Sequence, residues 1–201
     1  MGEPRVLVEA NLRKLGGLEI RGEEIFVLSR IALAVSAIER GVSPHVVSQF
    51  LSWREFEEEV AAILEESGAS CLRGLRCSKP QKLEVDVVGL LGREVLIVDC
   101  KHWNPRSSTP SRLAAIAEQH ARRARKLTLC RELIEEIERE AGGGIAHLYP
   151  IVVTLLSKMR GPLGGATIVP ISLLASFLRC FDELKLELPR IAIEPAGCER
   201  C

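Results

Sequence analysis

The segments EVDVVG (residues 84–89) and VLIVDCK (residues 95–101) decide the fold that the sequence predicts. Residues 95–98 form an apolar run, which is typical of a strand buried inside a sheet. Side chains alternate between the two faces of a strand, so Asp99 and Lys101 share one face. Turn residues separate the segments, which suits two adjacent antiparallel strands. Such a pair could bring Asp86 and Asp99 together at one end of the sheet.

Two carboxylates placed this close have a chemical consequence. They repel one another unless a cation lies between them. Mg²⁺ prefers oxygen ligands and usually binds one or two carboxylates, with water and substrate phosphate completing its shell. Lys101 beside such a site can orient or help to deprotonate an attacking water, and it can stabilise charge on a phosphate. The alternative is that Asp99 and Lys101 only end the strand in solvent.

The helix expected over residues 53–67 carries a carboxylate on its apolar side. Ser52 and Glu55 form a capping box at its start. At roughly 100° per residue, Glu57 projects into the same face as the apolar residues of the helix. A carboxylate on a buried face needs a partner, which a metal site or Lys101 would provide. The alternative is that Glu57 lies at the edge of the apolar stripe with its tip in water.

These features, taken in order, resemble the core of the PD-(D/E)xK nuclease superfamily, and most of all the Mrr-type restriction endonucleases and the archaeal Holliday-junction resolvases. The likeness covers roughly residues 52–130, and it rests on Phe56-Glu57, Gly68, Glu84-Val-Asp86 and Asp99-Cys-Lys101. Two positions depart from the family pattern. Val85 stands where the motif often has proline, and Asp99 stands where glutamate is commoner.

The resemblance implies a role for each site residue. Asp86 and Asp99, with the backbone carbonyl of Cys100, would hold Mg²⁺, for which Mn²⁺ could substitute. Lys101 would act on the nucleophilic water, and Glu57 would bind the metal directly or through water. The expected activity is hydrolysis of DNA phosphodiester bonds. The alternative is a DNA-binding protein without catalysis, built on a nuclease-like fold.

The order of predicted elements gives the fold class. From Ser52 onward the order is α-β-β-β-α-β, which favours an α/β fold of the restriction-endonuclease-like kind, with a central mixed sheet flanked by helices. We expect a nuclease-like domain over residues 52–201 after a small lead-in region, residues 1–51. After the helix over 53–67, the expected strands are 70–76, 83–90, 94–101, 148–156, 167–170 and 186–194, and the expected helices run from Pro110 as far as Glu140 and over 172–183.

The lead-in region contains a candidate DNA reader. Residues 18–28 suggest a hairpin that turns at Arg21-Gly22. Residues 37–51 (AIERGVSPHVVSQFL) resemble a helix-turn-helix, in which a glycine turn joins two short helices. The alternative is a plain pair of packed helices.

Several basic and polar residues are candidates for nucleic-acid contacts. Gln119 and Arg123 lie four residues apart at the edge of the apolar stripe of the long helix. The densest basic run lies near the second strand, and His102 follows the predicted catalytic lysine. The alternatives are an ordinary helix-edge hydrogen bond for Gln119, a part in sealing the sheet for His102 and a solvated hairpin for the basic run. His120 is expected to be a buried core histidine. The run consists of Arg73, Arg76, Lys79 and Lys82.

Composition limits the other possibilities. The chain has 27 basic and 27 acidic residues, so it lacks the basic excess of a non-specific DNA coat. We find no membrane-spanning run and no signal-peptide pattern, and we expect a cytoplasmic protein. The seven cysteines are irregularly spaced, which argues against a disulfide framework. Cys198 and Cys201 form half a zinc site at best, so no zinc is expected.

The expected partner is duplex or branched DNA. Cutting both strands of a duplex is simplest with two symmetric sites, which favours a homodimer.

Overall fold

The computed structural model describes residues 11–22, 24–79, 82–101, 109–155, 157 and 159–193. The chain divides into two compact units, residues 1–59 and residues 60–201. The division falls within helix α4 (Trp53–Glu66), which matches the helix predicted over 53–67. Among the described helices, none is both long enough and apolar enough to cross a bilayer.

The first unit contains a hairpin and two helices. Strands β1 (Leu18–Arg21) and β2 (Glu24–Val27) pair antiparallel, so the predicted hairpin is confirmed. Helix α2 (Arg30–Glu39) begins at Ser29, whose hydroxyl accepts a hydrogen bond of 3.0 Å from the backbone of Ala32. A short turn leads to α3 (Pro44–Ser48). The helix-turn-helix order is therefore present, although α3 has only 5 residues.

The second unit is built on a seven-stranded mixed sheet of order β3-β4-β5-β6-β8-β7, with β9 pairing the start of β6. Strands β3, β4 and β5 are antiparallel, whereas β5, β6 and β8 run parallel. The predicted α/β fold with a central mixed sheet flanked by helices is confirmed. The strands are β3 (Ser70–Cys77), β4 (Leu83–Leu91), β5 (Glu94–Lys101), β6 (His147–Thr154), β7 (Gly161–Leu163), β8 (Ala166–Pro170) and β9 (Ile191–Ala192).

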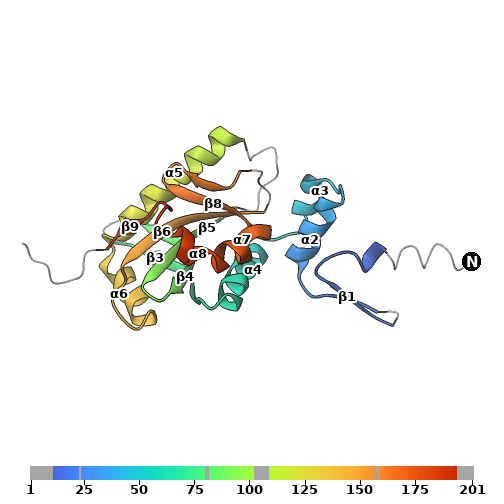
Figure 1. Cartoon of the computed structure of the whole chain (residues 1–201), viewed down its shortest axis with the longest axis horizontal. Coiled ribbons are helices and arrows are strands. Elements are labelled where there is room, and N and C mark those ends of the chain that lie inside the picture. The colour runs from blue at the N-terminus through green and yellow to red at the C-terminus, as the bar shows by residue number, and fades with distance from the viewer. Residues whose placement is uncertain are drawn as a thin grey trace, which may run out of the picture. The chain divides into compact units, whose positions relative to one another are not determined.

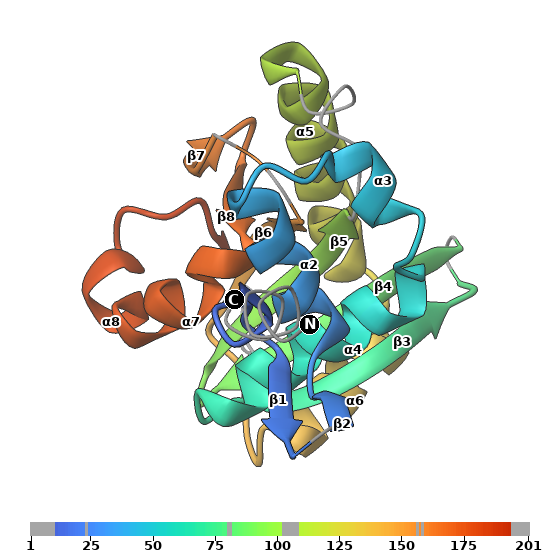
Figure 2. The same cartoon turned by 90° about the vertical axis from the view of Figure 1, so that its right-hand side faces the viewer.

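Helices cover both faces of this sheet (Figures 1 and 2). One face packs against α5 and α6 through clusters that include Ile97, Leu127 and Ile137. On the opposite face, the C-terminal part of α4 approaches so closely that Gly89 leaves room for Leu64. The helices that follow β5 are α5 (Pro110–Leu127), α6 (Arg131–Glu140), α7 (Ile171–Arg179) and α8 (Phe181–Leu184).

The single long helix predicted from Pro110 to Glu140 is wrong, because the chain breaks between α5 and α6. The Thr128 hydroxyl bonds back to the Arg125 carbonyl at 2.8 Å. The backbone of Cys130 then bonds to Leu127 at 2.9 Å, three residues back, which tightens the last turn. The predicted helix 172–183 likewise divides into α7 and α8. The predicted last strand shortens to β9, and β7 was not predicted.

One disulfide bond joins Cys77, at the end of β3, to Cys130, between α5 and α6. The irregular spacing of the cysteines did not predict this disulfide bond. The described residues hold no framework of several disulfides. Both cysteines are buried in the core cluster beneath α5 and α6. The residues are 53 positions apart, and only the packing of α6 against β3 brings them together. Cys198 and Cys201 lie outside the described residues.

Candidate functional site

The site forms where β4 and β5 stop pairing. Their antiparallel register ends at Val87, which is paired with Val98. The next position on each strand is an aspartate, Asp86 on β4 and Asp99 on β5. Here the Asp86 side chain replaces the ladder, since its Oδ2 accepts a hydrogen bond of 2.8 Å from the backbone N–H of Cys100. The structure thus brings both predicted carboxylates to one end of the β4–β5 pair.

An irregularity in β3 lies opposite this point. Gly74 stands across from Asp86 in the β3–β4 register and has φ +60°, a left-handed conformation that glycine adopts without steric cost. Leu72 and Leu75 are three positions apart, yet both pack into the same core cluster. In a regular strand they would point to opposite faces. Asp86 therefore lies where the sheet departs from regular alternation.

Asp99 is held by two cations. Its side chain is only 3% exposed, and its Oδ1 accepts a hydrogen bond of 2.5 Å from Nη2 of Arg123. Its Oδ2 lies 2.8 Å from Nζ of Lys101, which makes an ion pair. Oδ2 is buried and has no hydrogen-bond partner among the described residues. Asp99 and Lys101 thus lie together on one face of β5.

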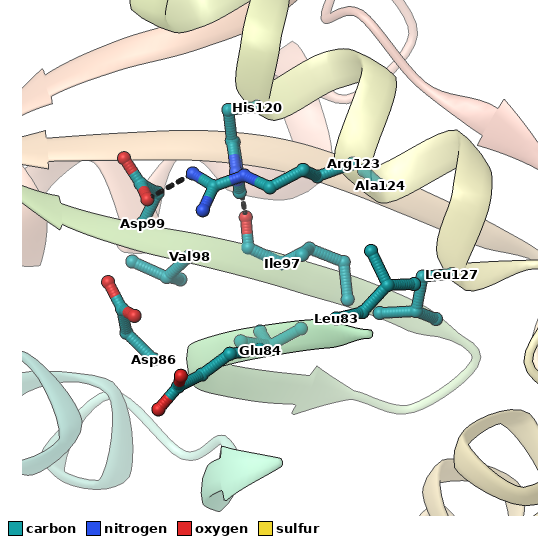
Figure 3. A pocket seen from close by; sticks show the side chains of 11 residues that line it. Leu83, Glu84, Asp86, Ile97, Val98, Asp99, His120, Arg123, Ala124 and Leu127 are labelled. Atoms are coloured by element: carbon teal, nitrogen blue, oxygen red, sulfur yellow. Dashed lines mark hydrogen bonds and ion pairs between the residues drawn. The ribbon is translucent and has the colours of Figure 1, made fainter. Parts of the chain in front are cut away.

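A small cavity connects these groups (Figure 3). Its volume is about 10 Å³, close to the space occupied by one water-sized sphere. The apolar part of its wall comes from the sheet and from α5. Its polar wall consists of Glu84, Asp86, Asp99, His120 and Arg123. Three acidic residues, an imidazole and a guanidinium therefore line a space of atomic size.

His120 fixes α5 over the site. Its side chain is buried, and its Nε2 lies 2.7 Å from the carbonyl oxygen of Ile97, to which it donates (Figure 3). Burial is the main cause that lowers the pKa of this imidazole, which favours its neutral form. The expectation of a buried core histidine is confirmed. Because Arg123 is one helical turn further along α5, this anchor places the guanidinium beside Asp99.

The surroundings of Asp86 disfavour its charged form. Burial is the largest cause that raises the pKa of this carboxyl, and the charge of Asp99 adds to the rise. The N–H of Cys100 acts in the opposite direction, as do the charges of Lys101 and Arg123. A cation placed between the two carboxylates would relieve the repulsion.

The raised pKa of Asp86 predicts a pH-dependent stability. The folded protein holds a proton at this carboxyl over a range in which the unfolded chain, with its ordinary value of 3.8, has lost it. This contribution is fully present below the unfolded pKa and is lost as pH rises through the folded pKa. Without added metal, wild type should lose stability relative to Asp86→Asn as pH rises from about 3.5 to about 7.

Urea unfolding across this range measures the difference. Asp182→Asn, which removes an exposed carboxylate on α8, is the control and should show no such trend. A wild-type stability that rises relative to Asp86→Asn with increasing pH would contradict the assignment.

The donor atoms of the site are suited to a hard cation. Asp86 and Asp99 offer carboxylate oxygens, and Mg²⁺ often binds proteins through no more than two of these. The described residues contain no group of three or more His, Cys, Asp or Glu side chains arranged to hold a metal. Binding of Mg²⁺ by Asp86 and Asp99 therefore stays a prediction.

The other predicted site residues have different outcomes. Glu57 is half-buried on α4 and belongs to the first unit, so its predicted contact with the metal stays a prediction. The predicted role of the Cys100 carbonyl also stays a prediction. Gln119 is exposed on α5. His102 lies outside the described residues.

The predicted basic run is exposed along β3 and the segment that follows it. One member already has an acidic partner, because Arg76 bonds to Glu84 at 2.8 Å and both side chains are largely exposed. Such a surface pair contributes little to stability and does not prevent a phosphate contact. The run comprises Arg73, Arg76, Lys79 and Lys82.

Sequence reasoning missed one feature of the site, the ion pair between Arg123 and Asp99. Arg123 was predicted to contact nucleic acid from the edge of the apolar stripe, and its side chain is 37% exposed. A signal was present, since Arg123 follows the buried His120 by three residues, a spacing that places both on one side of α5. The same argument that singled out Glu57 applies to this arginine.

Comparison with known proteins identifies no family. No protein-family model matches the sequence. No curated protein matches it either. Among solved structures, one similar chain is a protein of unknown function, AF1548, with 19% identity and a TM-score of 0.31 over 49% of this chain and 46% of that one. Another is protein VC1899 from Vibrio cholerae, with 10% identity and a TM-score of 0.34 over 89% of this chain and 42% of that one. The chain thus spans less than half the length of each of these two structures.

Proposed function

We propose that the protein is a metal-dependent endonuclease that hydrolyses DNA phosphodiester bonds. The observation that carries the proposal is the meeting of Asp86, Asp99 and Lys101 where β4 and β5 part. The α4-β3-β4-β5-α5 order and the following β6 agree with the restriction-endonuclease-like core that the sequence motif implies. The geometry of the site motivates phosphodiester hydrolysis. We choose DNA rather than RNA as the substrate because the sequence motif resembles that of DNA nucleases.

Asp86 and Asp99 would hold the metal in this proposal. A metal held there would supply activation of water and neutralisation of charge on the phosphate. The protein's own residues do the rest. Asp99 orients Lys101 through their 2.8 Å ion pair, so that the ammonium group lies beside the reacting phosphate. Water attacks phosphorus and the P–O3′ bond breaks, which leaves a 5′-phosphate and a 3′-hydroxyl.

Lys101 supports the charged transition state. Its side chain is 15% exposed, so its charge acts where little water screens it. A preorganised cation of this kind stabilises negative charge that develops on the phosphate. Thr154 on the neighbouring strand β6 is buried and lies in register with Lys101 in the parallel pair β5–β6.

Lys101→Met is expected to lower the cleavage rate roughly 10²–10³-fold, the usual loss when one such stabilising group is removed. Cleavage of supercoiled plasmid and of a four-way junction with Mg²⁺ or Mn²⁺ measures this, and EDTA should abolish the wild-type activity. The control is Lys185→Met, which removes a lysine at the end of α8 that forms an ion pair with Asp182. Equal cleavage by wild type and Lys101→Met would exclude the proposal.

A second function, DNA binding without catalysis, is favoured by the charge balance of the site. Asp86 and Asp99 already face two cations, Lys101 and Arg123, so the cluster is neutral without a metal when all four are ionised. The α2–α3 pair would then serve as the reader. Calorimetric titration with Mn²⁺ separates the two functions, because only the nuclease requires a metal bound at Asp86 and Asp99.

A further inference from the structure

The position of Arg123 suggests more than a static ion pair. Its guanidinium touches Asp99 with a single nitrogen, Nη2. Its Nε is buried and has no hydrogen-bond partner among the described residues. Arginine normally binds a carboxylate or phosphate through two parallel bonds, so this contact leaves a buried donor unused.

The two ends of this contact differ in exposure. The Asp99 side chain is 3% exposed, whereas that of Arg123 is 37% exposed. The carboxylate is therefore fixed on the inner strand β5, while the arginine reaches it from a partly open helix surface. His120 anchors α5 beneath, so the helix can stay in place while the arginine side chain changes partner.

We infer that Arg123 occupies Asp99 in place of the metal and moves to the substrate phosphate when metal binds, so that metal and DNA binding are coupled. The inference rests on the proposed function and adds how that site is regulated. A divalent cation and the guanidinium compete for the same carboxylate. With Mg²⁺ present, two carboxylates face the metal, Lys101 and Arg123, which leaves an excess of two positive charges, and one phosphodiester would offset one of them.

Coupling of this kind has a definite sign. Removing the guanidinium removes a competitor of the metal, so the metal should bind more tightly to an Arg123 variant. It also removes a phosphate ligand, so DNA should bind more weakly. A purely structural arginine would not produce this pair of opposite changes, since loss of support for Asp99 would weaken both.

The test uses Arg123→Gln in the full chain. Mn²⁺ affinity is measured by calorimetry, and duplex DNA affinity by fluorescence anisotropy with and without Ca²⁺, which also binds oxygen ligands. We expect Mn²⁺ to bind the variant about tenfold more tightly, and the rise in DNA affinity that Ca²⁺ causes in wild type to disappear, because couplings typically fall between about 5-fold and 150-fold. Arg122→Gln, which removes an exposed neighbour paired with Glu118, should behave as wild type in both measurements.

Other outcomes separate the inference from the proposed function. If Mn²⁺ binds wild type but binds Arg123→Gln equally or more weakly, the exchange of partners is excluded and the nuclease assignment is untouched. If wild type binds no Mn²⁺, both are excluded. Arg123→Lys serves where the glutamine variant unfolds: it retains a competing cation, so Mn²⁺ affinity should stay near wild type, but it cannot make two parallel bonds, so the Ca²⁺ effect on DNA should still be lost.

Discussion

Asp99→Asn is expected to lower DNA cleavage by about 10³-fold and to abolish calorimetric binding of Mn²⁺. Asp99 forms ion pairs with both Lys101 and Arg123, and its Oδ2 has no hydrogen-bond partner among the described residues. A metal at such a site supplies several kcal/mol of transition-state stabilisation. Each ~1.4 kcal/mol is a factor of ten in rate, so about three powers of ten should be lost.

The same substitution also affects folding, and this must be separated from the chemistry. It leaves Lys101 and Arg123 beside a neutral amide. Breaking a fully buried pair costs roughly 3–5 kcal/mol, and the partial exposure of Arg123 places the cost below that range. Thermal unfolding therefore accompanies the assay, which is run where the variant is fully folded. Asp182→Asn is the matched control, since it removes a carboxylate that is 89% exposed. Cleavage by folded Asp99→Asn at the wild-type rate would contradict the role of Asp99.

Reduction of the Cys77–Cys130 bond is expected to cost about 2–4 kcal/mol of stability, since the bond closes a long loop of the unfolded chain. For a protein of this size, 1 kcal/mol shifts the melting temperature by about 2–4 °C, so a fall of roughly 10 °C is expected. Thermal unfolding with and without dithiothreitol measures it, and Cys130→Ser should reproduce the reduced value.

Two controls accompany the reduction experiment. Cys180→Ser, which removes an exposed free thiol, should leave the melting temperature unchanged. Peptide mapping without reductant should recover a fragment that joins Cys77 to Cys130. The absence of that fragment, together with a melting temperature insensitive to dithiothreitol, would show that the two thiols are not bonded in the protein.

Much of the second unit could be predicted from local patterns. The strands at β3, β4 and β5 were expected within one residue at each end, because apolar runs and turn residues mark them clearly. In the first unit, the capping box of α4 could also be predicted. Its Ser52 hydroxyl accepts from the Glu55 N–H at 3.1 Å, and the Glu55 carboxylate accepts from the Ser52 N–H at 2.8 Å. Local rules work where the bonds themselves are local.

What escaped prediction depends on contacts between distant segments. No glycine or proline marks the break between α5 and α6. Cys130 lies at this break, and its disulfide bond joins it to Cys77 of β3. Strand β7 has only 3 residues, and it forms by pairing back onto β8. The hydrogen bond from Arg123 to Asp99 joins residues 24 positions apart, and it requires α5 to cross the end of β5. Spacing within α5 places Arg123 on the side of His120, but it does not show which distant residue the guanidinium meets.

The site itself was predictable in part, for a physical reason. Alternation on β5 places Asp99 and Lys101 on one face. The tight turn before β5 pairs it with β4, which brings Asp86 to the same end of the pair. The pattern could not show which cation neutralises Asp99. In the folded chain this is Lys101 together with Arg123, and the account requires that a metal can displace the arginine.

Diffraction from crystals grown with Mn²⁺ tests the metal site without reference to activity, because the anomalous signal locates the metal. We expect one peak within about 2.5 Å of a carboxylate oxygen of both Asp86 and Asp99, with the Arg123 guanidinium moved away from Asp99. No peak between these carboxylates, with Arg123 still bonded to Asp99, would contradict this expectation.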